Sequence, residues 1–293
     1  MLLTSATLDP PSDRNADGNR FPAFEREIGI REKDRQSRFN VRVEPSKFGR
    51  LVFRLADRAV PRPGLEDEDG GFQSDPVWLD YVAGMIRTAM AEKAGESVGA
   101  DGNRVLVLTT SYTDAEALAA RVDGLEAHRR GTKLDGYVDA FKRNPVAALV
   151  TPAGWAGLNL PGLVKHLVVA RLPFAPPNPV EDDLLRALLA ARGMGGREID
   201  GILMVRRMEE TRRRLRQGLG RAIRAPEDAA TVWIGDPRFP LPELLVRDRR
   251  ARVSQGLAAP FTSFIATIPV RFREGMRPAW DEARIHGGGV SGC

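Results

Sequence analysis

The stretch Val105–Thr110, VLVLTT, decides the fold class of this 293-residue chain. Its unbroken apolar run has the length of a strand, as expected for a parallel strand that is buried on both faces. Two more short apolar runs, Val146–Val150 and Val164–Ala170, follow it along the chain, and Thr231–Ile234 reads as a last strand. The chain therefore contains at least four strands of the kind found in a buried sheet.

Helices are expected between and around these strands. Apolar positions at helical spacing, or capping signals, predict helices over Pro76–Lys93, Thr113 to about Val122, Lys133–Lys142 and Arg206–Arg221. In the second of these, Thr113 and Glu116 have the spacing of a capping box. Strands that alternate with helices imply right-handed crossovers, so we predict an α/β domain in three layers with a mostly parallel sheet.

Composition and charge narrow the class of protein. Hydrophobic residues make up 42% of the chain, without a run near the roughly 20 apolar residues of a membrane span. The first ten residues lack a signal-peptide pattern, so a cytoplasmic location is expected. The single cysteine, Cys293, excludes a disulfide within the chain, and the three histidines lack the spacing of metal ligands. The net charge of +5 fits either a polyanionic partner or simply a basic surface.

The functional residues are expected in the loops that follow the strands. Ligands of parallel sheets bind at the carboxyl ends of the strands, which here points to the loops after Thr110, Val150, Ala170 and Ile234. The second loop, TPAGWAGLNLPG over Thr151–Gly162, has glycines that allow close backbone approach. Its Trp155 either stacks on a base or packs the domain, and the whole loop is equally compatible with an ordinary turn.

The stretch QGLGRAIRAPED, residues 217–228, carries the clearest chemical signal. Gln217, Arg221 and Arg224 are spaced four and three apart, which aligns them on one helical stripe. Gly218 and Gly220 remove bulk, so another surface can approach. Two fixed guanidinium groups suit the developing charge of a γ-phosphate. A solvated basic helix is the alternative, and it is preferred, together with a nucleic-acid backbone contact, for the arginines at 206, 207, 212, 213 and 214.

Three weaker signals complete the pattern. TSATL, Thr4–Leu8, is either a hydroxyl relay or an ordinary strand end. RLPFAPPNP, Arg171–Pro179, is a stiff segment that serves as a ledge or as a connector. In IGDPRF, Ile234–Phe239, Asp236 and Arg238 either brace the arginine stripe or form a structural ion pair.

Taken in order, these segments are far more specific than any of them alone. TSATL, VLVLTTSY, GWAGLNLPG, RLPFAPPNP and QGLGRAIR followed by GDPRF resemble the C-terminal half of a DinG/XPD-like superfamily 2 helicase, over about residues 1–240. In that family the first, second, third and fifth are motifs III, IV, V and VI. The resemblance implies the second RecA-like lobe of an ATP-dependent helicase that moves 5′→3′ along single-stranded DNA.

The resemblance also implies roles for individual residues. The arginine fingers and their neighbour, which reach a nucleotide held by the first lobe, are Arg221, Arg224 and Gln217. Residues implied on the nucleotide side are Thr4, Ser5, Thr7, Gly157, Asn159 and Asp236. Residues implied to contact nucleic acid are Thr110, Ser111, Tyr112, Trp155, Arg171 and Arg213. Motif V links both ligands, so Trp155, Gly157 and Asn159 are candidates for that coupling.

Two departures from the family pattern lie in motif V. The family usually has an acidic residue after the tryptophan and an aspartate before the Leu/Val-Pro-Gly, whereas this chain has Ala156 and Asn159. A carboxylate role in motif V is therefore in doubt. The asparagine and the phrase WIGDPRFPLP are similar to the CRISPR-associated (type IV) DinG branch, which would add a CRISPR effector complex as a partner.

The larger departure concerns the ATP site. The chain has no G-x-x-x-x-G-K-[ST] loop and no DEAH motif, and DEAR at Asp281 lies at the wrong end. We therefore expect a truncated gene, a split reading frame or a late start, inactive alone and binding ATP and Mg²⁺ only with a first lobe. The expected organisation is a junction remnant over 1–30, a RecA-like domain over 31–280 and a disordered tail over 281–293. A non-enzymatic nucleic-acid-binding or adaptor fragment, and a non-functional remnant, remain open alternatives.

Overall fold

The computed structural model describes residues 49–57, 59–66, 72–92, 102–160, 162–175, 178–223, 225–240, 263–268, 272–273 and 276–278. The predictions for Thr4, Ser5 and Thr7, for Arg224, and for the segments 1–30 and 281–293 lie outside these residues.

The centre of the domain is a seven-stranded sheet in the order β5-β6-β4-β7-β8-β1-β9. Every neighbouring pair in it is parallel. The strands are β1 Arg50–Leu55, β4 Val105–Leu108, β5 Leu125–Ala127, β6 Ala148–Thr151, β7 His166–Val169, β8 Ala229–Ile234 and β9 Met276–Pro278. A separate antiparallel hairpin pairs β2, Gly64–Glu66, with β3, Phe72–Ser74. The predicted α/β class with a parallel sheet is confirmed.

The apolar runs of the sequence became the centre of this sheet. All four residues of β4, β6 and β7 are buried, because helices cover both faces of these strands. On one face lie α2, Pro76–Ala91, and α3, Tyr112–Ala119. On the other lie α4, Leu134–Arg143, the last turns of α6 and the short helix η3, Ser263–Thr267. The three-layer prediction therefore holds.

The start of α3 corrects one sequence prediction. The N-cap is Ser111, not Thr113, and its hydroxyl accepts from the Asp114 amide at 3.0 Å. An N-cap needs extended backbone, which Ser111 has with φ −141° and ψ 155°, whereas Thr113 already lies within the helix. The predicted capping box is wrong, and α3 begins at Tyr112.

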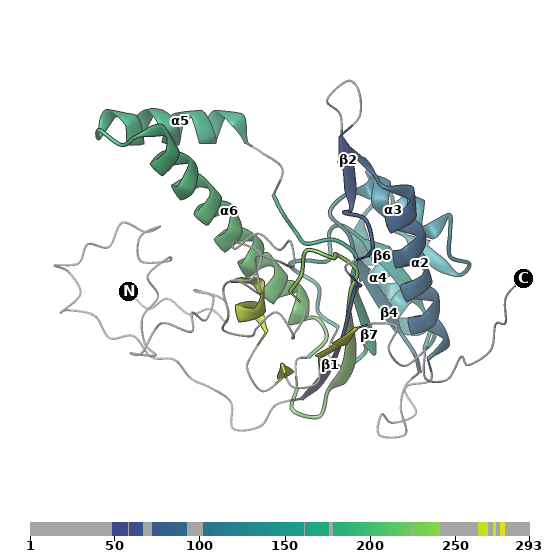
Figure 1. Cartoon of the computed structure of the whole chain (residues 1–293). Helices are drawn as coiled ribbons and strands as arrows, with labels where there is room; N and C mark the ends of the chain where they lie inside the picture. The colour runs from purple at the N-terminus through teal and green to yellow at the C-terminus, as the bar shows by residue number, and fades with distance from the viewer. Residues whose placement is uncertain are drawn as a thin grey trace, which may run out of the picture.

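A helical arm projects from the domain body (Figure 1). It consists of α5, Pro179–Ala191, and the first half of α6, which runs over Gly196–Leu219. The arm has a small core of its own, formed by Leu189, Ile199 and Leu203. The predicted basic helix is thus ten residues longer at its N-terminal end. Met208, Leu215 and Leu219 of α6 are buried, while Met204 lies on the arm and is exposed.

Candidate functional site

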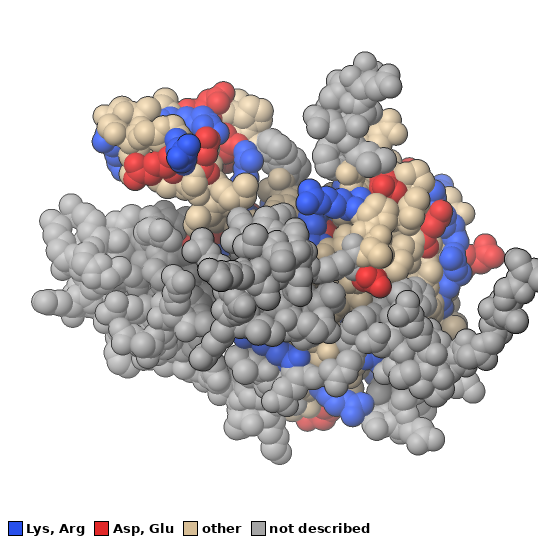
Figure 2. Space-filling view, viewed as in Figure 1, with Lys and Arg blue, Asp and Glu red and all other residues tan. Residues whose placement is uncertain are grey.

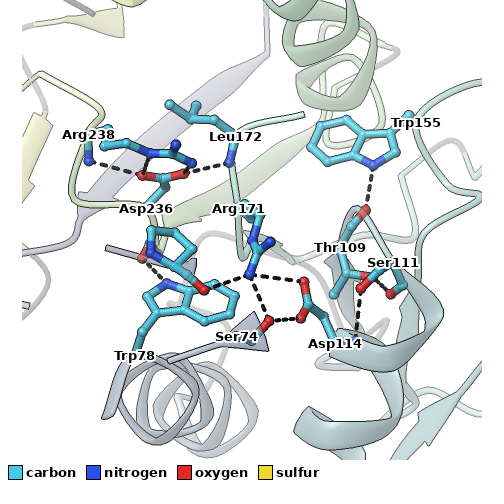
Figure 3. Close-up of polar contacts among 12 residues, drawn as sticks. Ser74, Trp78, Thr109, Ser111, Asp114, Trp155, Arg171, Leu172, Asp236 and Arg238 are labelled. Carbon is cyan, nitrogen blue, oxygen red and sulfur yellow. Dashed lines mark hydrogen bonds and ion pairs between the residues drawn. The ribbon is translucent and has the colours of Figure 1, made fainter. Parts of the chain in front are cut away.

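The loops that follow β4, β6, β7 and β8 lie at one edge of the sheet, because parallel strands end on the same side. We call this the carboxyl edge. It consists of residues 109–111, 152–160, 170–175 and 235–240. Most of the predicted site residues fall in these loops or next to them, and Figure 3 shows how polar contacts tie the loops together.

Trp155 packs the domain. Its indole is buried, and Nε1 donates to the Thr109 carbonyl at 2.7 Å, which joins the loop after β6 to the loop after β4 (Figure 3). The ring lies against Gly218 of α6, where an added Cβ would come within 2.7 Å of the indole. Of the two interpretations that the sequence left open, the structure favours packing over base stacking. The bulk that Gly218 removes makes room for this lobe's own tryptophan.

Arg221 also lies against the loop after β6. Its guanidinium donates from Nη1 to the Leu158 carbonyl and from Nη2 to the Trp155 carbonyl, the latter at 3.2 Å. The residue is buried, with 8% of its surface exposed. In this structure Arg221 therefore contacts its own lobe, and its predicted contact with a nucleotide held by another lobe stays a prediction. The physical reason for the contact within the lobe is that carbonyls of an irregular buried loop need donors, and Arg221 is within reach of two of them.

Gln217, Gly157 and Asn159 of these two motifs remain near the surface. Gln217 is half-buried one turn before Arg221. Gly157 and Asn159 are exposed, and Gly157 has a φ of +79°, a backbone conformation that favours glycine. The structure therefore brings motif V and motif VI together through Trp155, Leu158, Gly218 and Arg221.

Asp236 forms a structural ion pair. Its carboxylate is fully buried and accepts two hydrogen bonds from the Arg238 guanidinium, at 2.9 and 2.6 Å (Figure 3). It also accepts from the Leu172 amide at 2.9 Å, which fastens the loop after β8 to the segment after β7. These contacts favour the structural alternative over a brace for the arginine stripe.

Arg171 is held inside the fold as well. Its Nη2 donates to the Pro63 carbonyl at 2.7 Å and to Ser74 at 2.8 Å, and it lies 3.5 Å from an Asp114 carboxylate oxygen (Figure 3). The guanidinium also stacks 4.9 Å from the ring centre of Trp78. Burial lowers the pKa of Arg171, and the charges of Asp114 and Asp236 oppose that shift. This geometry favours a bracing role over the predicted nucleic-acid contact.

Thr110, Ser111 and Tyr112 are half-buried at the carboxyl edge, where α3 begins. Next to them lies His128, a residue that the sequence interpretation considered only as a metal ligand. Its Nε2 lies 3.1 Å from the Thr132 carbonyl and its Nδ1 lies 3.0 Å from the Thr151 hydroxyl. A carbonyl only accepts, so Nε2 carries the proton and Nδ1 accepts from Thr151. No spacing in the sequence could have shown this contact.

The arginines of α6 are paired with carboxylates. Arg213 and Arg214 both bind Glu210, the second at 2.8 Å, and Arg206 and Arg207 bind Glu181 and Asp182 of α5. Burial tends to raise the pKa of Glu210, but the hydrogen bonds and charges of Arg213 and Arg214 outweigh it and lower that pKa. The predicted contact of Arg213 with nucleic acid would have to compete with this pairing.

The described part of the chain contains no group of three or more His, Cys, Asp or Glu residues that could hold a metal ion. None of the helices in that part combines the length and the apolar character that a membrane crossing requires.

The described residues form a parallel α/β lobe in which the loop after β6 contacts the segment that follows α6. The helicase C-terminal domain family matches residues 96–245, and the chain belongs to that family. The fold is accordingly that of a RecA-like helicase lobe, as the resemblance to DinG/XPD-like helicases predicted.

Three solved structures are similar to the chain. An XPD helicase is 21% identical, with a TM-score of 0.44, over 74% of this chain and 34% of that one. An apo XPD is 20% identical, with a TM-score of 0.43, over 73% and 38%. Xpd4 of S. tokodaii is 18% identical, with a TM-score of 0.39, over 75% and 39%. This chain therefore spans less than two fifths of their length. No curated protein sequence matches it.

Proposed function

We propose that the chain is the C-terminal motor lobe of a DinG/XPD-like, ATP-dependent DNA helicase, and that it works together with an ATP-binding first lobe. Membership of the helicase C-terminal domain family supports the motor class. The observation that carries the proposal is the contact of the Arg221 guanidinium with the carbonyls of Trp155 and Leu158. In the proposal, this contact joins the arginine that binds phosphate to the loop that contacts the nucleic acid.

In this proposal Arg221 couples the two ligands. When the first lobe brings a nucleotide to the carboxyl edge, the guanidinium exchanges two neutral carbonyls for phosphate oxygens. Hydrogen bonds between two charged groups are roughly twice as strong as neutral ones, so the exchange is favourable. It also releases the carbonyls of Trp155 and Leu158, which lets the loop after β6 move. Gln217, half-buried beside it, and Arg224 would complete the phosphate contacts.

ATP and Mg²⁺ fit the described residues only in part. Arg221 supplies a cation for the terminal phosphates, whereas the described residues offer no cluster of carboxylates for a metal ion. We propose that the other lobe holds the triphosphate and Mg²⁺. The arginine then stabilises the negative charge that develops on the transferred phosphoryl group. Asp236, with its carboxylate already bound to Arg238 and Leu172, would position the edge and not touch the nucleotide.

The test is reconstitution of ATP hydrolysis. The 293-residue chain is combined with the separately produced ATP-binding lobe of a DinG/XPD-like helicase, and hydrolysis is measured with and without single-stranded DNA. We expect no hydrolysis by the chain alone and DNA-stimulated hydrolysis by the pair. Arg221→Ala should lower the rate on the order of 10³-fold, while the exposed Arg197→Ala serves as the matched control.

Because Arg221 also braces a loop, melting temperatures of both variants must be compared. Arg221→Lys keeps the charge but loses the two-pronged geometry, so it should recover stability more fully than activity. A wild-type rate for Arg221→Ala would rule out the arginine-finger role. Hydrolysis by the chain alone would contradict the two-lobe proposal itself.

Finer assignments also belong to the proposal. Translocation 5′→3′ on single-stranded DNA and a cytoplasmic location follow from the resemblance to DinG/XPD-like helicases. A domain over 31–280 stays a prediction. The CRISPR-associated branch rests on Asn159 and the phrase WIGDPRFPLP alone, so it stays a prediction.

A further inference from the structure

The loop after β5 carries a group of cations that the motifs do not include. We call residues 128–133, with the sequence HRRGTK, the β5 loop. It follows the carboxyl end of β5, so it lies on the same side of the sheet as the carboxyl edge, next to the loop after β6. Its position continues the line of predicted nucleic-acid contacts that starts at α3.

The β5 loop is fixed in place from within. His128 is buried and bridges the Thr132 carbonyl and the Thr151 hydroxyl, and Thr151 also accepts from the Ala153 amide at 3.1 Å. The Thr132 hydroxyl donates to the Arg129 carbonyl at 2.7 Å. These bonds attach the β5 loop to the first residues of motif V, so the backbone of the loop is held at a defined place.

Two tyrosines flank the histidine. The ring of Tyr112 lies edge-on to His128 at 5.3 Å, and Tyr137 lies at 5.1 Å on a tilted plane. The Arg130 guanidinium is 5.9 Å from the ring centre of Tyr112, which connects the β5 loop to the first residue of α3. The N-terminal end of a helix carries partial positive charge, so the basic loop and the start of α3 act on an anion together.

The cations of this loop are exposed to solvent. Arg129, Arg130 and Lys133 are each exposed, and none forms an ion pair with a residue that the structure describes. Glu126 of β5 and Asp135, in the first turn of α4, are the acidic residues nearest to them along the chain. Three exposed cations that form no ion pair with a described residue are a strong attraction for a polyanion, because no described carboxylate has to be displaced first.

We infer that the β5 loop binds the phosphate backbone of a single-stranded nucleic acid that runs along the carboxyl edge from the start of α3. Arg129 and Arg130 contact phosphate oxygens with their planar guanidinium groups, and Lys133 adds a point charge. His128 is a positioning residue that orients the loop. The inference rests on the proposed function, because the strand is the one on which the motor would move.

The test is binding of a fluorescein-labelled oligo-dT of about 20 nucleotides to the full chain without ATP, followed by fluorescence anisotropy at several salt concentrations. Arg129→Ala/Arg130→Ala should weaken binding on the order of tenfold near 0.1 M salt. It should also reduce the slope of log K against log salt by roughly 0.7 for each lost contact. The matched control, Lys142→Ala/Arg143→Ala, removes two exposed cations from the far end of α4 and should leave both quantities unchanged.

Two further measurements separate charge from folding and from partner class. Arg129→Lys/Arg130→Lys keeps the charge and should keep most of the salt slope. Polyglutamate of similar length should compete poorly with oligo-dT; equal competition would contradict a nucleic-acid site. If the chain binds oligo-dT but the alanine pair does not change affinity or slope, the β5 loop is not a contact and the motor proposal is unaffected. If the unaltered chain binds no oligo-dT, both fail.

Discussion

The arm and the β5 loop are both rich in arginine, yet the two regions differ in whether their arginines are paired with carboxylates. On the arm, Arg186 binds Asp200 at 2.7 Å, and Arg206 and Arg207 bind acidic residues of α5. Figure 2 shows acidic and basic side chains intermixed there. In the β5 loop, Arg129 and Arg130 form no ion pair with any described residue. Pairing, and not the number of arginines, decides which surface attracts a polyanion.

Exposed apolar side chains are a second difference between the arm and the β5 loop. Five of the large hydrophobic residues that are exposed in the described part of the chain lie on the arm: Val180, Leu184, Leu188, Met204 and Val205. The arm therefore combines a neutralised set of charges with apolar side chains that face solvent. The β5 loop has the reverse character, because its three cations face solvent and form no ion pair with a described residue.

The largest expected effect concerns the buried ion pair of the carboxyl edge. Asp236→Ala would leave the Arg238 guanidinium and the Leu172 amide without their acceptor, at a cost of about 3–5 kcal/mol in the free energy of unfolding. Urea denaturation monitored by circular dichroism measures it. Asp236→Asn keeps one acceptor oxygen, so it should lower the free energy of unfolding by less than Asp236→Ala does. A loss below about 1 kcal/mol for the alanine variant would show that this pair is no stronger than those of the arm.

The buried His166 should make the free energy of unfolding depend on pH, with a change similar in size to that expected for Asp236→Ala. Burial lowers the pKa of His166 from 6.5 to about 4, so the unfolded chain binds a proton in this range and the folded chain does not. Stability should therefore fall by roughly 3 kcal/mol as the pH drops from about 6.5 to about 4. Asn in place of His166 keeps an acceptor for Trp233, which donates to Nδ1 at 3.2 Å, and should flatten this window.

Glu210 of α6 provides the contrast. The pKa of Glu210 is lowered in the folded chain. Its contribution to the free energy of unfolding is therefore fully present above its ordinary pKa of 4.5, and it is lost as the pH falls through the lower pKa of the folded chain. His166→Asn should leave that lower window unchanged. If the variant keeps the full loss between pH 6.5 and 4, another group than His166 titrates there.

Substitutions of two glycines of α6 should give the next largest changes in the free energy of unfolding. One glycine lies beside the carboxyl edge and the other lies on the arm. Gly218→Ala puts a methyl group 2.7 Å from the Trp155 ring, and we expect a loss of about 1–3 kcal/mol. Gly201→Ala, on the arm, meets no atom within 4 Å and should gain up to about 1 kcal/mol from helix propensity. Denaturation curves of both variants decide the matter. A gain at both positions would mean that Trp155 does not depend on the space at Gly218.

The smallest effects are expected for the ion pairs of the arm. Glu181→Gln and Asp182→Asn should each cost less than about 1 kcal/mol, because the pairs are partly exposed and screened by salt. The loss should shrink further at 1 M salt. A larger, salt-independent loss would indicate that the arm is built on its charges instead of on Leu189, Ile199 and Leu203.

The sequence predicted the centre of the fold better than its edges. Val105–Leu108 and the two later apolar runs were recognisable because strands buried on both faces are mostly apolar, with only Thr151 and His166 as polar members here. β5 was missed, since three residues with an exposed Glu126 give no such pattern. α5 was missed although its signal was present: Asn178 caps it and Pro179 opens it, but the preceding prolines were interpreted as one extended segment.

The candidate site was predictable in its location and not in its contacts. The order of the motifs placed Trp155, Gly218 and Arg221 at the carboxyl edge. Their packing depends on how closely a loop 60 residues away approaches α6, which local patterns do not encode. For the same reason His128, whose partners are Thr132 and Thr151, had no recognisable role in the sequence.

The most direct test of the central claim compares the two arginine-rich regions in one binding experiment. The salt dependence of oligo-dT binding is measured for the unaltered chain, for Arg129→Ala/Arg130→Ala and for Arg206→Ala/Arg207→Ala. The arm variant should bind with the affinity and salt slope of the unaltered chain. The β5-loop variant should bind on the order of tenfold more weakly, and its slope of log K against log salt should be smaller by roughly 1.4. A loss confined to the arm variant would contradict the claim that unpaired cations at the sheet edge form the nucleic-acid surface.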